Sequence, residues 1–353
     1  MRKFVIAFIK RQPLEILVPV LLLALLAVIV FGLQLGYLSF SLPTIVNVLL
    51  YKIFGWSPQP LDNATLDVVW QLRLPRVLLA ACVGMGLTLS GLIMQAVVQN
   101  PLADPYILGM SSGASLGATS AIFLGAGSIF GAQAVGICAC AGAFGVSLLV
   151  VFICSRGEKN NAVRLLLSGM ALSAVCSSAS GFIVYIGKNK EGMEAITYWL
   201  MGTVANAKLP QVLLLLFLTA AITLYFTRRT RILNLFLLGS DTAMTLGVDL
   251  RCYLPRFLLL NGLLTGFIVL NAGMIGFIGL VVPHMVRSVF GSNHKKLLPA
   301  AVLSGGIFAA AMDIMSRTLL HGVDIPLGVV FALIGAPCFI YLMLQKKYKF
   351  GGN

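Results

Sequence analysis

Residues 72–98 read LRLPRVLLAACVGMGLTLSGLIMQAVV, and no charged side chain follows Arg76 in this stretch. The hydrocarbon core of a bilayer is about 30 Å thick, so a helix needs about 20 residues to cross it. The stretch is long enough and apolar enough to cross as one helix. We therefore predict a transmembrane helix over 72–98, and much of the remaining chain is equally apolar.

The composition of the whole chain agrees with this prediction. Of 353 residues, 59% are hydrophobic and only 10% are charged, and the mean hydropathy is +0.98. A soluble domain carries roughly a quarter charged residues because its surface faces water. The composition excludes a soluble globular protein. It predicts an all-α polytopic membrane protein that forms a single transmembrane domain over 1–353.

The same length criterion predicts about ten spans. The first predicted span contains an apolar stretch over 16–33. This stretch is longer than the apolar core of a signal peptide, so we interpret it as a membrane helix. The spans are expected at residues 14–34, 72–98, 106–124, 131–154, 163–187, 209–227, 255–272, 275–290, 297–320 and 325–345.

Three segments between the spans are expected to lie outside the bilayer core. Residues 35–71 are rich in Pro, Ser, Asp and Asn and are predicted to form a loop. Residues 187–208 are predicted to hold a helix at the membrane interface. Residues 228–254 are predicted to hold two short helices that are joined near a glycine, with Ser240 or Asp241 as a cap.

The basic residues are unevenly distributed, which predicts the orientation. Ten spans place both termini on one side, and eighteen of the 25 Lys and Arg then fall on that side. Cytoplasmic loops of membrane proteins carry excess Lys and Arg, so both termini are predicted to be cytoplasmic. No basic helix face accompanies the clusters, which argues against nucleic-acid binding. The clusters are Arg2, Lys3, Lys10, Arg11; Arg156, Lys159, Arg164; Arg228, Arg229, Arg231, Arg251, Arg256; Arg287, Lys295, Lys296; and Lys346, Lys347, Lys349.

A weak internal repeat is present. Residues 74–79 (LPRVLL) are echoed by residues 254–259 (LPRFLL) at an offset of 180. Five spans separate the two copies, so they would enter the membrane from opposite faces. This predicts an inverted repeat over about 72–187 and 255–345, the usual basis for alternating access.

No motif for chemistry or for an energy source is found. The chain lacks G-x-x-x-x-G-K-[ST], and no pair of intramembrane carboxylates suggests a proton relay. His284 has no second ligand at matching depth, and the seven cysteines are interpreted as small buried hydrophobes. We expect no metal site, no resident cofactor and no enzymatic activity.

Two groups of residues are candidates for helix junctions near a gate. Their simplest role is structural, because prolines and Asn/Asp pairs end helices, and polar groups at membrane depth face protein or water. A role in gating is the alternative. The groups are Asn100, Pro101, Asp104 and Pro105 after the second span, and Pro283, His284 and Arg287 in the eighth.

Three arginines depart from the positive-inside pattern. Arg73, Arg76 and Arg317 fall at predicted outer helix ends. They could reach the lipid head groups, or Arg317 could pair with Asp313 one helical turn earlier. The other interpretation is a cationic surface that docks an acidic partner from outside.

Four sequence blocks together resemble the permease subunits of bacterial importers for iron–siderophore complexes, haem and cobalamin. The resemblance covers about residues 14–345. The blocks are LRLPR at 72–76, SGLIMQAVVQNPLADPYILGMSSGA at 90–114, GFIGLVVPHMVR at 276–287 and DIPLGVVFALIGAPCFIYLM at 324–343.

The resemblance implies the type II permease fold of ATP-binding cassette (ABC) importers in the bacterial inner membrane. It also implies a homodimer with the pathway at its interface, two cytoplasmic ATPase subunits that bind ATP and Mg, and an extracytoplasmic substrate-binding protein. The arginines Arg73, Arg76 and Arg317 match residues that meet this protein. A segment of about 236–250 matches the helices that couple to the ATPase, with Leu238, Gly239, Ser240, Asp241, Thr242, Ala243, Leu246 and Gly247.

The expected function is ATP-driven uptake of a metal chelate. An iron–siderophore complex is expected first, and haem and cobalamin remain open, as does a heteromeric dimer. An ion-coupled secondary transporter is the alternative, although no ion site is found for it. An intramembrane enzyme would need a nucleophile with a base or clustered metal ligands, which His284 alone does not supply.

Overall fold

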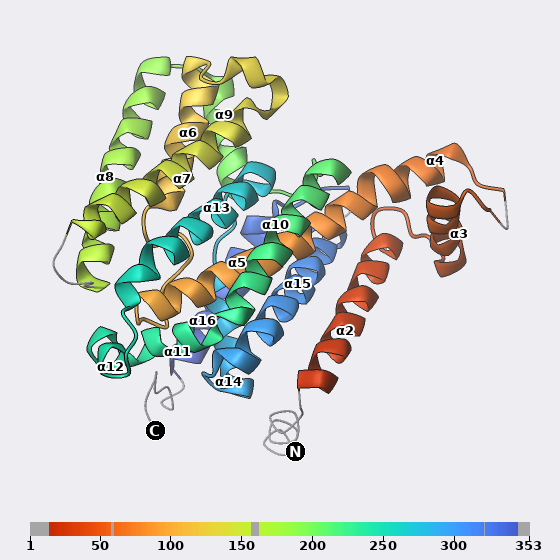
Figure 1. Cartoon of the computed structure of the whole chain (residues 1–353). Helices are drawn as coiled ribbons and strands as arrows, with labels where there is room; N and C mark the ends of the chain where they lie inside the picture. Colours follow the sequence, from red (N-terminus) through yellow and green to blue (C-terminus); the bar gives the residue numbers. More distant parts are fainter. Residues whose placement is uncertain (1–13, 58–59, 157–161, 321, 345–353) are drawn as a thin grey trace.

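The computed structural model describes residues 14–57, 60–156, 162–320 and 322–344, and the regular secondary structure of these residues is helical (Figure 1). The terminal basic clusters at 2–11 and 346–349, and Lys159, lie outside the described residues. The all-α prediction is confirmed.

Each of the ten predicted spans coincides with a helix. Seven are long and apolar enough to cross a bilayer, and α6, α14 and α16 are shorter. The long ones are α2 (Leu14–Gln34), the continuous helix Asn63–Val97 that contains α5 (Leu74–Val97), α7 (Ala134–Ser155), α8 (Ala162–Gly187), α10 (Leu209–Arg228), α13 (Leu254–Ala272) and α15 (His294–Thr318). The short ones are α6 (Met110–Leu124), α14 (Ile278–Phe290) and α16 (Leu327–Leu344).

Helix α5 runs through the middle of the bundle and is buried along most of its length (Figure 1). Lipid supplies no hydrophobic force between helices, so small residues that allow close approach hold them together. Gly84 lies against the backbone of Gly305 in α15, and Gly91 lies against Gly279 in α14. A Cβ at Gly91 would be only 1.9 Å from the carbonyl oxygen of Gly279.

The two halves of the chain are interleaved rather than separate. Helix α5 packs on α15, α13 packs on α7, and α5 and α13 also contact each other. The first helix of each predicted repeat unit therefore packs on a helix of the other unit. The two predicted repeat units are therefore in direct contact through these helices.

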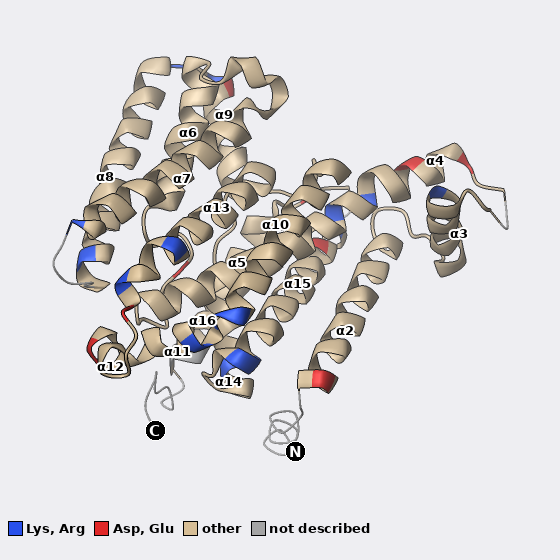
Figure 2. Cartoon of the chain, in the orientation of Figure 1, with Lys and Arg blue, Asp and Glu red and all other residues tan. Residues whose placement is uncertain are grey.

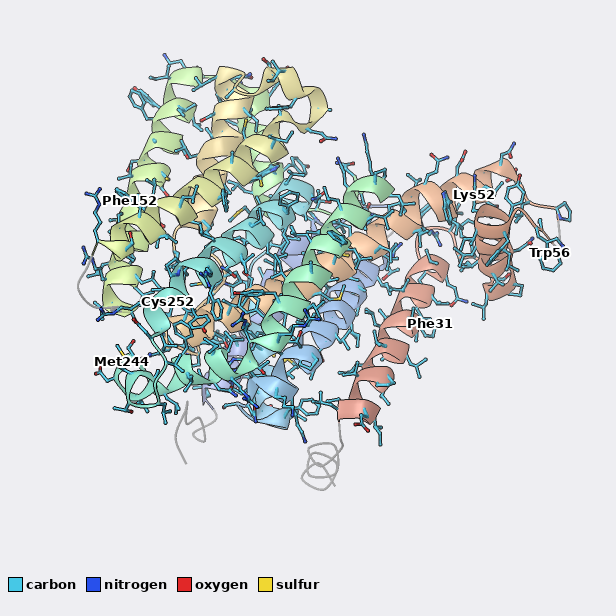
Figure 3. The ribbon with its side chains drawn as sticks, viewed as in Figure 1. Phe31, Lys52, Trp56, Phe152, Met244 and Cys252 are labelled. Atoms are coloured by element: carbon cyan, nitrogen blue, oxygen red, sulfur yellow. The ribbon has the colours of Figure 1, made fainter. Side chains whose placement is uncertain are left out.

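The outer surface of the bundle is apolar. Phe31 of α2 is 56% exposed and Phe152 of α7 is 53% exposed, and both lie on the outside of the bundle (Figure 3). Large apolar side chains on the outside of a helical bundle match a lipid environment.

The segment 35–71 is more helical than predicted. It contains α3 (Leu42–Phe54), and from Asn63 the chain is already helical through α4 (Asn63–Leu66) and a π-helical stretch η1 (Asp67–Arg73). The Oγ of Ser41 accepts a hydrogen bond from the backbone N–H of Thr44, and Gly55 at φ +72° ends α3. Turn-forming residues in this segment cap helices instead of forming one long loop.

The other two segments largely match their predictions. Helix α9 (Lys190–Met201) follows Asn189, whose side chain caps it. Helices α11 (Thr230–Leu238) and α12 (Ser240–Thr245) are joined at Gly239, with φ +92°. The predicted cap at Ser240 or Asp241 is wrong, because Gly239 holds the N-cap position and α12 has no side-chain cap.

We expect Gly91→Ala to destabilise the bundle by about 1–3 kcal/mol, because the new methyl group forces α5 and α14 apart. The measurement is thermal unfolding in detergent. Gly145→Ala in α7 is the matched control, since a Cβ there meets no atom within 4 Å. Equal melting temperatures for the two variants would contradict close packing at Gly91.

Candidate functional site

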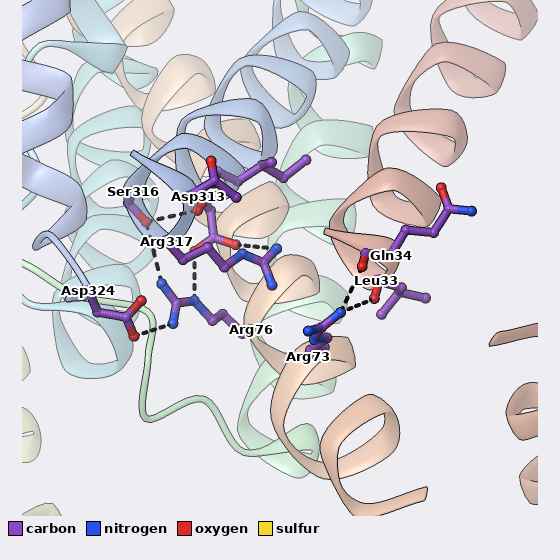
Figure 4. Close-up of polar contacts among 10 residues, drawn as sticks. Leu33, Gln34, Arg73, Arg76, Asp313, Ser316, Arg317 and Asp324 are labelled. Carbon is purple, nitrogen blue, oxygen red and sulfur yellow. Dashed lines mark hydrogen bonds and ion pairs between the residues drawn. The ribbon is translucent and has the colours of Figure 1, made fainter. Parts of the chain in front are cut away.

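Five charged residues form a cluster at one end of the bundle, which we call the arginine end (Figure 4). The arginine cluster comprises Arg73, Arg76, Asp313, Arg317 and Asp324. The Nε of Arg76 lies 2.8 Å from Asp313 Oδ1, and its NH1 lies 2.7 Å from Asp324 Oδ2. Arg317 NH2 lies 3.0 Å from Asp313 Oδ2, which confirms the predicted pairing within one helix.

Arg73 is buried and bonded to backbone. Its NH1 donates to the carbonyl oxygens of Leu33 (2.7 Å) and Gln34 (3.0 Å), and its NH2 donates to that of Leu38. The guanidinium also lies over the ring of Phe40, 4.6 Å from its centroid. A cation is favourable here because the last carbonyls of a helix lack partners and carry partial negative charge. Arg73 therefore ties the end of α2 to α5.

The cluster joins several elements and surrounds a hollow. It connects α2, α5, α15 and the connection that leads to α16. A cavity of about 730 Å³ is lined by Arg73, Arg76, Arg317 and Asp324, among others. Three arginines and two aspartates leave one net positive charge. The three predicted docking arginines thus share one site, but each is largely buried and has partners within the chain.

The predicted coupling segment lies at the opposite end, which we call the α12 end (Figure 1). A cavity of about 600 Å³ at this end is lined by the start of α8 and by Leu238, Gly239, Ser240, Asp241 and Thr242. Ala243 is buried, and Gly247 has φ +78° in open space.

Three apolar side chains of this segment are exposed. Leu238, Met244 and Leu246 are each more than half exposed, and Met244 lies at the edge of the molecule in Figure 3. Leu238 ends α11, Met244 lies in α12 and Leu246 directly follows α12, all outside the predicted spans, so lipid does not explain their exposure. A cluster of exposed apolar residues outside the membrane indicates a surface for a protein partner.

Helix α11 is anchored to the start of α15 by a polar junction. The Oδ1 of Asn234 accepts from the backbone N–H of His294 (3.0 Å) and lies 2.8 Å from its Nδ1, while its Nδ2 donates to Asn293 Oδ1 (3.1 Å). Asn293 in turn caps α15. Sequence analysis missed this junction, because Asn234 and His294 are 60 residues apart and neither belongs to a motif.

The first group of predicted gate residues contacts the helix that carries the second group. The side chain of Asn100 accepts from the N–H of Leu102, and Asp104 Oδ1 accepts from the N–H of Tyr106 (2.8 Å). Pro105 lies against Gly279 of α14, the helix of the second group. Pro101 lies in the turn that begins this segment.

Helix α14 presents the second group to the interior. Pro283, His284 and Arg287 are buried, and Arg287 NH2 donates to Gln95 Oε1 of α5 (2.9 Å). The His284 ring meets Phe339 of α16 edge to face. This segment therefore links α5, α14 and α16 by polar and aromatic contacts.

Asp104 is the titratable group of this junction that lies between spans. Removal of water by the surrounding protein raises the pKa of its carboxyl to about 6, and the hydrogen bond from the Tyr106 N–H opposes part of that rise. In the described part of the chain, no three His, Cys, Asp or Glu side chains are grouped as metal ligands would be.

A family model for the FecCD transport family matches residues 22–345. The chain belongs to the FecCD transport family. FecCD proteins are the membrane components of ABC importers, which work with ATPases and binding proteins. The all-α permease fold predicted from the sequence is thereby confirmed.

Two relatives and two solved structures illustrate the similarity. The vitamin B12 import system permease BtuC of Citrobacter koseri is 38% identical over 279 residues, covering 79% of this chain and 83% of the relative. The hemin transport system permease HmuU of Yersinia pestis is 36% identical over 338 residues, covering 94% and 96%. An inward-facing metal-chelate type ABC transporter is 32% identical with a TM-score of 0.80, covering 93% of this FecCD chain and 98% of that one. PsaBC from Streptococcus pneumoniae, at 14% identity and a TM-score of 0.51 over 78% of this chain and 92% of that one, shares the fold.

We expect Asp313→Asn to destabilise the FecCD chain by about 3–5 kcal/mol, because Arg76 and Arg317 both lose their buried carboxylate. Thermal unfolding in detergent measures this. Asp67→Asn is the control, since Asp67 is exposed and bonds only Gln71 among its described side-chain partners. A melting temperature for Asp313→Asn within 1–2 °C of wild type would show that the pairs contribute little (roughly 1 kcal/mol or less).

We expect Asp104→Asn to change the pH dependence of stability. Asp104 has a raised pKa in the folded protein, so wild-type stability falls as pH rises from about 4 to about 6 and the buried carboxyl ionises. Asparagine keeps the acceptor for the Tyr106 N–H but does not ionise. The variant should match wild type near pH 4 and exceed it by about 2–3 kcal/mol at pH 7. A stability difference that does not vary with pH would contradict this assignment.

Proposed function

We propose that this FecCD permease is the transmembrane subunit of an ATP-driven importer of metal chelates. An iron–siderophore complex is the substrate we propose first, with haem and cobalamin as the other members of the class. The observation that carries the proposal is the similarity over nearly the whole chain to a metal-chelate type ABC transporter, at a TM-score of 0.80. Relatives named for vitamin B12 and hemin transport fall in the same chemical class.

We place the α12 end in the cytoplasm of a bacterial cell and the arginine end outside the inner membrane. Figure 2 shows that Lys and Arg gather at the α12 end, on α8, α11, α14 and the start of α15. This distribution follows the positive-inside rule. Helix α2 ends beside Arg73 and α16 begins just after Asp324, so α2 starts and α16 ends toward the α12 end. Both termini are accordingly cytoplasmic in this proposal.

We propose a homodimer with the pathway along α8. Helix α8 exposes apolar residues such as Met170, Val175 and Phe182. Between them it also exposes small and polar residues, and polar side chains at membrane depth tend to face protein or water. These residues are Ala171, Ala174, Ser177, Ser178 and Gly181. A second copy would cover part of the face and leave a polar route between the two chains.

The two ends take different partners in this proposal. Two ATPase subunits, which hold ATP and Mg, contact the α11–α12 segment through Leu238, Met244 and Leu246. A substrate-binding protein docks at the arginine end and places an acidic side chain in the cavity beside Arg76. The net positive charge of the cluster supports an acidic partner.

The interleaved packing of α5 with α15 and of α13 with α7 supports the inverted repeat. The equivalent helices of two inverted units lie in equivalent environments and enter the membrane from opposite faces. Such a repeat can adopt two nearly equivalent arrangements of its helices, each with the pathway open to a different side of the membrane. The ATPase selects between them through α11 and α12, and the chain itself performs no covalent chemistry.

Uptake into proteoliposomes tests the transport proposal. The permease and its ATPase are reconstituted together, and a panel of chelates is supplied on the binding protein. We expect ATP-dependent uptake of one chelate. Uptake that does not depend on ATP but does depend on an imposed ion gradient would instead establish the secondary-transporter alternative.

A variant tests the coupling surface. We expect Leu246→Asp to reduce co-purification of the ATPase at least about tenfold, because it places a charge in an apolar contact. Met193→Asp on α9 is the matched control, an apolar residue at the other end that is 50% exposed, against 61% for Leu246. Retention of the ATPase by the Leu246 variant would remove this segment from the interface.

A further inference from the structure

Arg76 lies between two carboxylates that differ sharply in exposure. The Asp313 side chain is 0% exposed, and the Asp324 side chain is 52% exposed. Their distances to Arg76 are nearly the same, 2.8 Å and 2.7 Å. One guanidinium therefore makes one buried contact and one contact open to solvent (Figure 4).

The two contacts have different energetic consequences. Asp313 also neutralises Arg317, so breaking its pairs leaves Arg317 without a carboxylate and Arg76 with only the exposed one. An ion pair with an exposed partner is worth roughly 0–1 kcal/mol, because water solvates the exposed carboxylate when it is released, while Arg76 keeps its bond to Asp313. Arg76 can thus exchange Asp324 for another carboxylate at low cost while Asp313 keeps it in place.

The surroundings allow such an exchange. Asp324 and the three arginines line the same cavity of about 730 Å³, so a carboxylate entering it arrives beside the Arg76–Asp324 pair. Displacing Asp324 from the cluster leaves three arginines facing one fixed aspartate. An acidic side chain of a partner would restore the negative charge that Asp324 supplies to the cluster in the free chain.

We propose that Asp324 is a built-in competitor for the docking arginine. It occupies Arg76 in the free chain and is displaced by an acidic side chain of the substrate-binding protein. This inference rests on the docking role proposed above for the arginine end. It adds that the affinity of docking is set by an intramolecular carboxylate as well as by the partner.

The position of Asp324 links docking to α16. Asp324 lies in the connection between α15 and α16, two residues after Gly322 (φ +79°), and α16 begins three residues later. The neighbouring Ile325 donates its backbone N–H to Ser316 (3.1 Å), and Gly328 lies against the backbone of Met201 and Met274. Release of Asp324 removes one of the contacts that hold the start of α16. Asp324 is thus a positioning residue for α16.

The test measures docking affinity with the full chain assembled with its ATPase in nanodiscs. The probe is the substrate-binding protein of the same importer. We expect Asp324→Asn to tighten binding about 2–5-fold, because it removes a competitor worth up to about 1 kcal/mol. Asp324→Glu, which keeps the carboxylate, should stay near wild type. Thermal unfolding of each variant shows that the fold is retained.

Asp67→Asn is the matched control. It removes an exposed carboxylate from the segment leading to Arg73 and changes the net charge equally, but Asp67 bonds Gln71 rather than an arginine of the cluster. The affinity of the Asp67→Asn variant for the substrate-binding protein should change less than that of the Asp324→Asn variant.

Three results would overturn the inference and leave docking intact: equal affinity of Asp324→Asn and wild type, equal tightening in both Asn variants, or weaker binding by Asp324→Asn. The last would make Asp324 a direct contact of the partner. If the wild-type complex binds no substrate-binding protein, the docking proposal itself fails, and this inference fails with it.

Discussion

The close approach of helix backbones along α5 is the constraint on which the rest of this fold depends. A bilayer gives apolar helices no hydrophobic reason to associate, so they are held by dispersion contacts and a few polar bonds. Gly84 and Gly91 bring α5 against α15 and α14 at distances that a side chain would prevent. Because α5 contacts α2, α10, α13, α14 and α15, its placement constrains theirs.

Polar groups are then confined to the two ends and to a few paired positions inside. At the arginine end, Arg73 satisfies the last carbonyls of α2, and Asp313 balances two arginines. At the α12 end, Asn234 joins α11 to the start of α15. Helix α15 carries one of these sites at each end. A single stiff helix therefore connects the proposed docking surface with the proposed coupling surface.

The sequence selected the three arginines of the cluster but not most of their contacts. The arginines Arg73, Arg76 and Arg317 were selected because they broke the charge pattern, and the structure brings them together. The pair Arg317–Asp313 was visible as an i, i+4 spacing. The partners of Arg76 were not, because Asp313 and Asp324 are more than 230 residues away. The hydrogen bonds from Arg73 to backbone carbonyls could not be predicted from the sequence, because every residue has a backbone carbonyl.

Hydrophobic length and charge, which are properties of the chain itself, predicted the class and the positions of the ten predicted spans. They do so because a bilayer imposes a fixed thickness and a penalty on charge at every segment separately. The helices within 35–71 were missed because capping residues and loop residues have the same composition there. Only the tertiary structure decided which helices touch, which arginine is buried and which carboxylate stays exposed. Those outcomes depend on distances between segments far apart in sequence, and such distances exist only once the helices have packed.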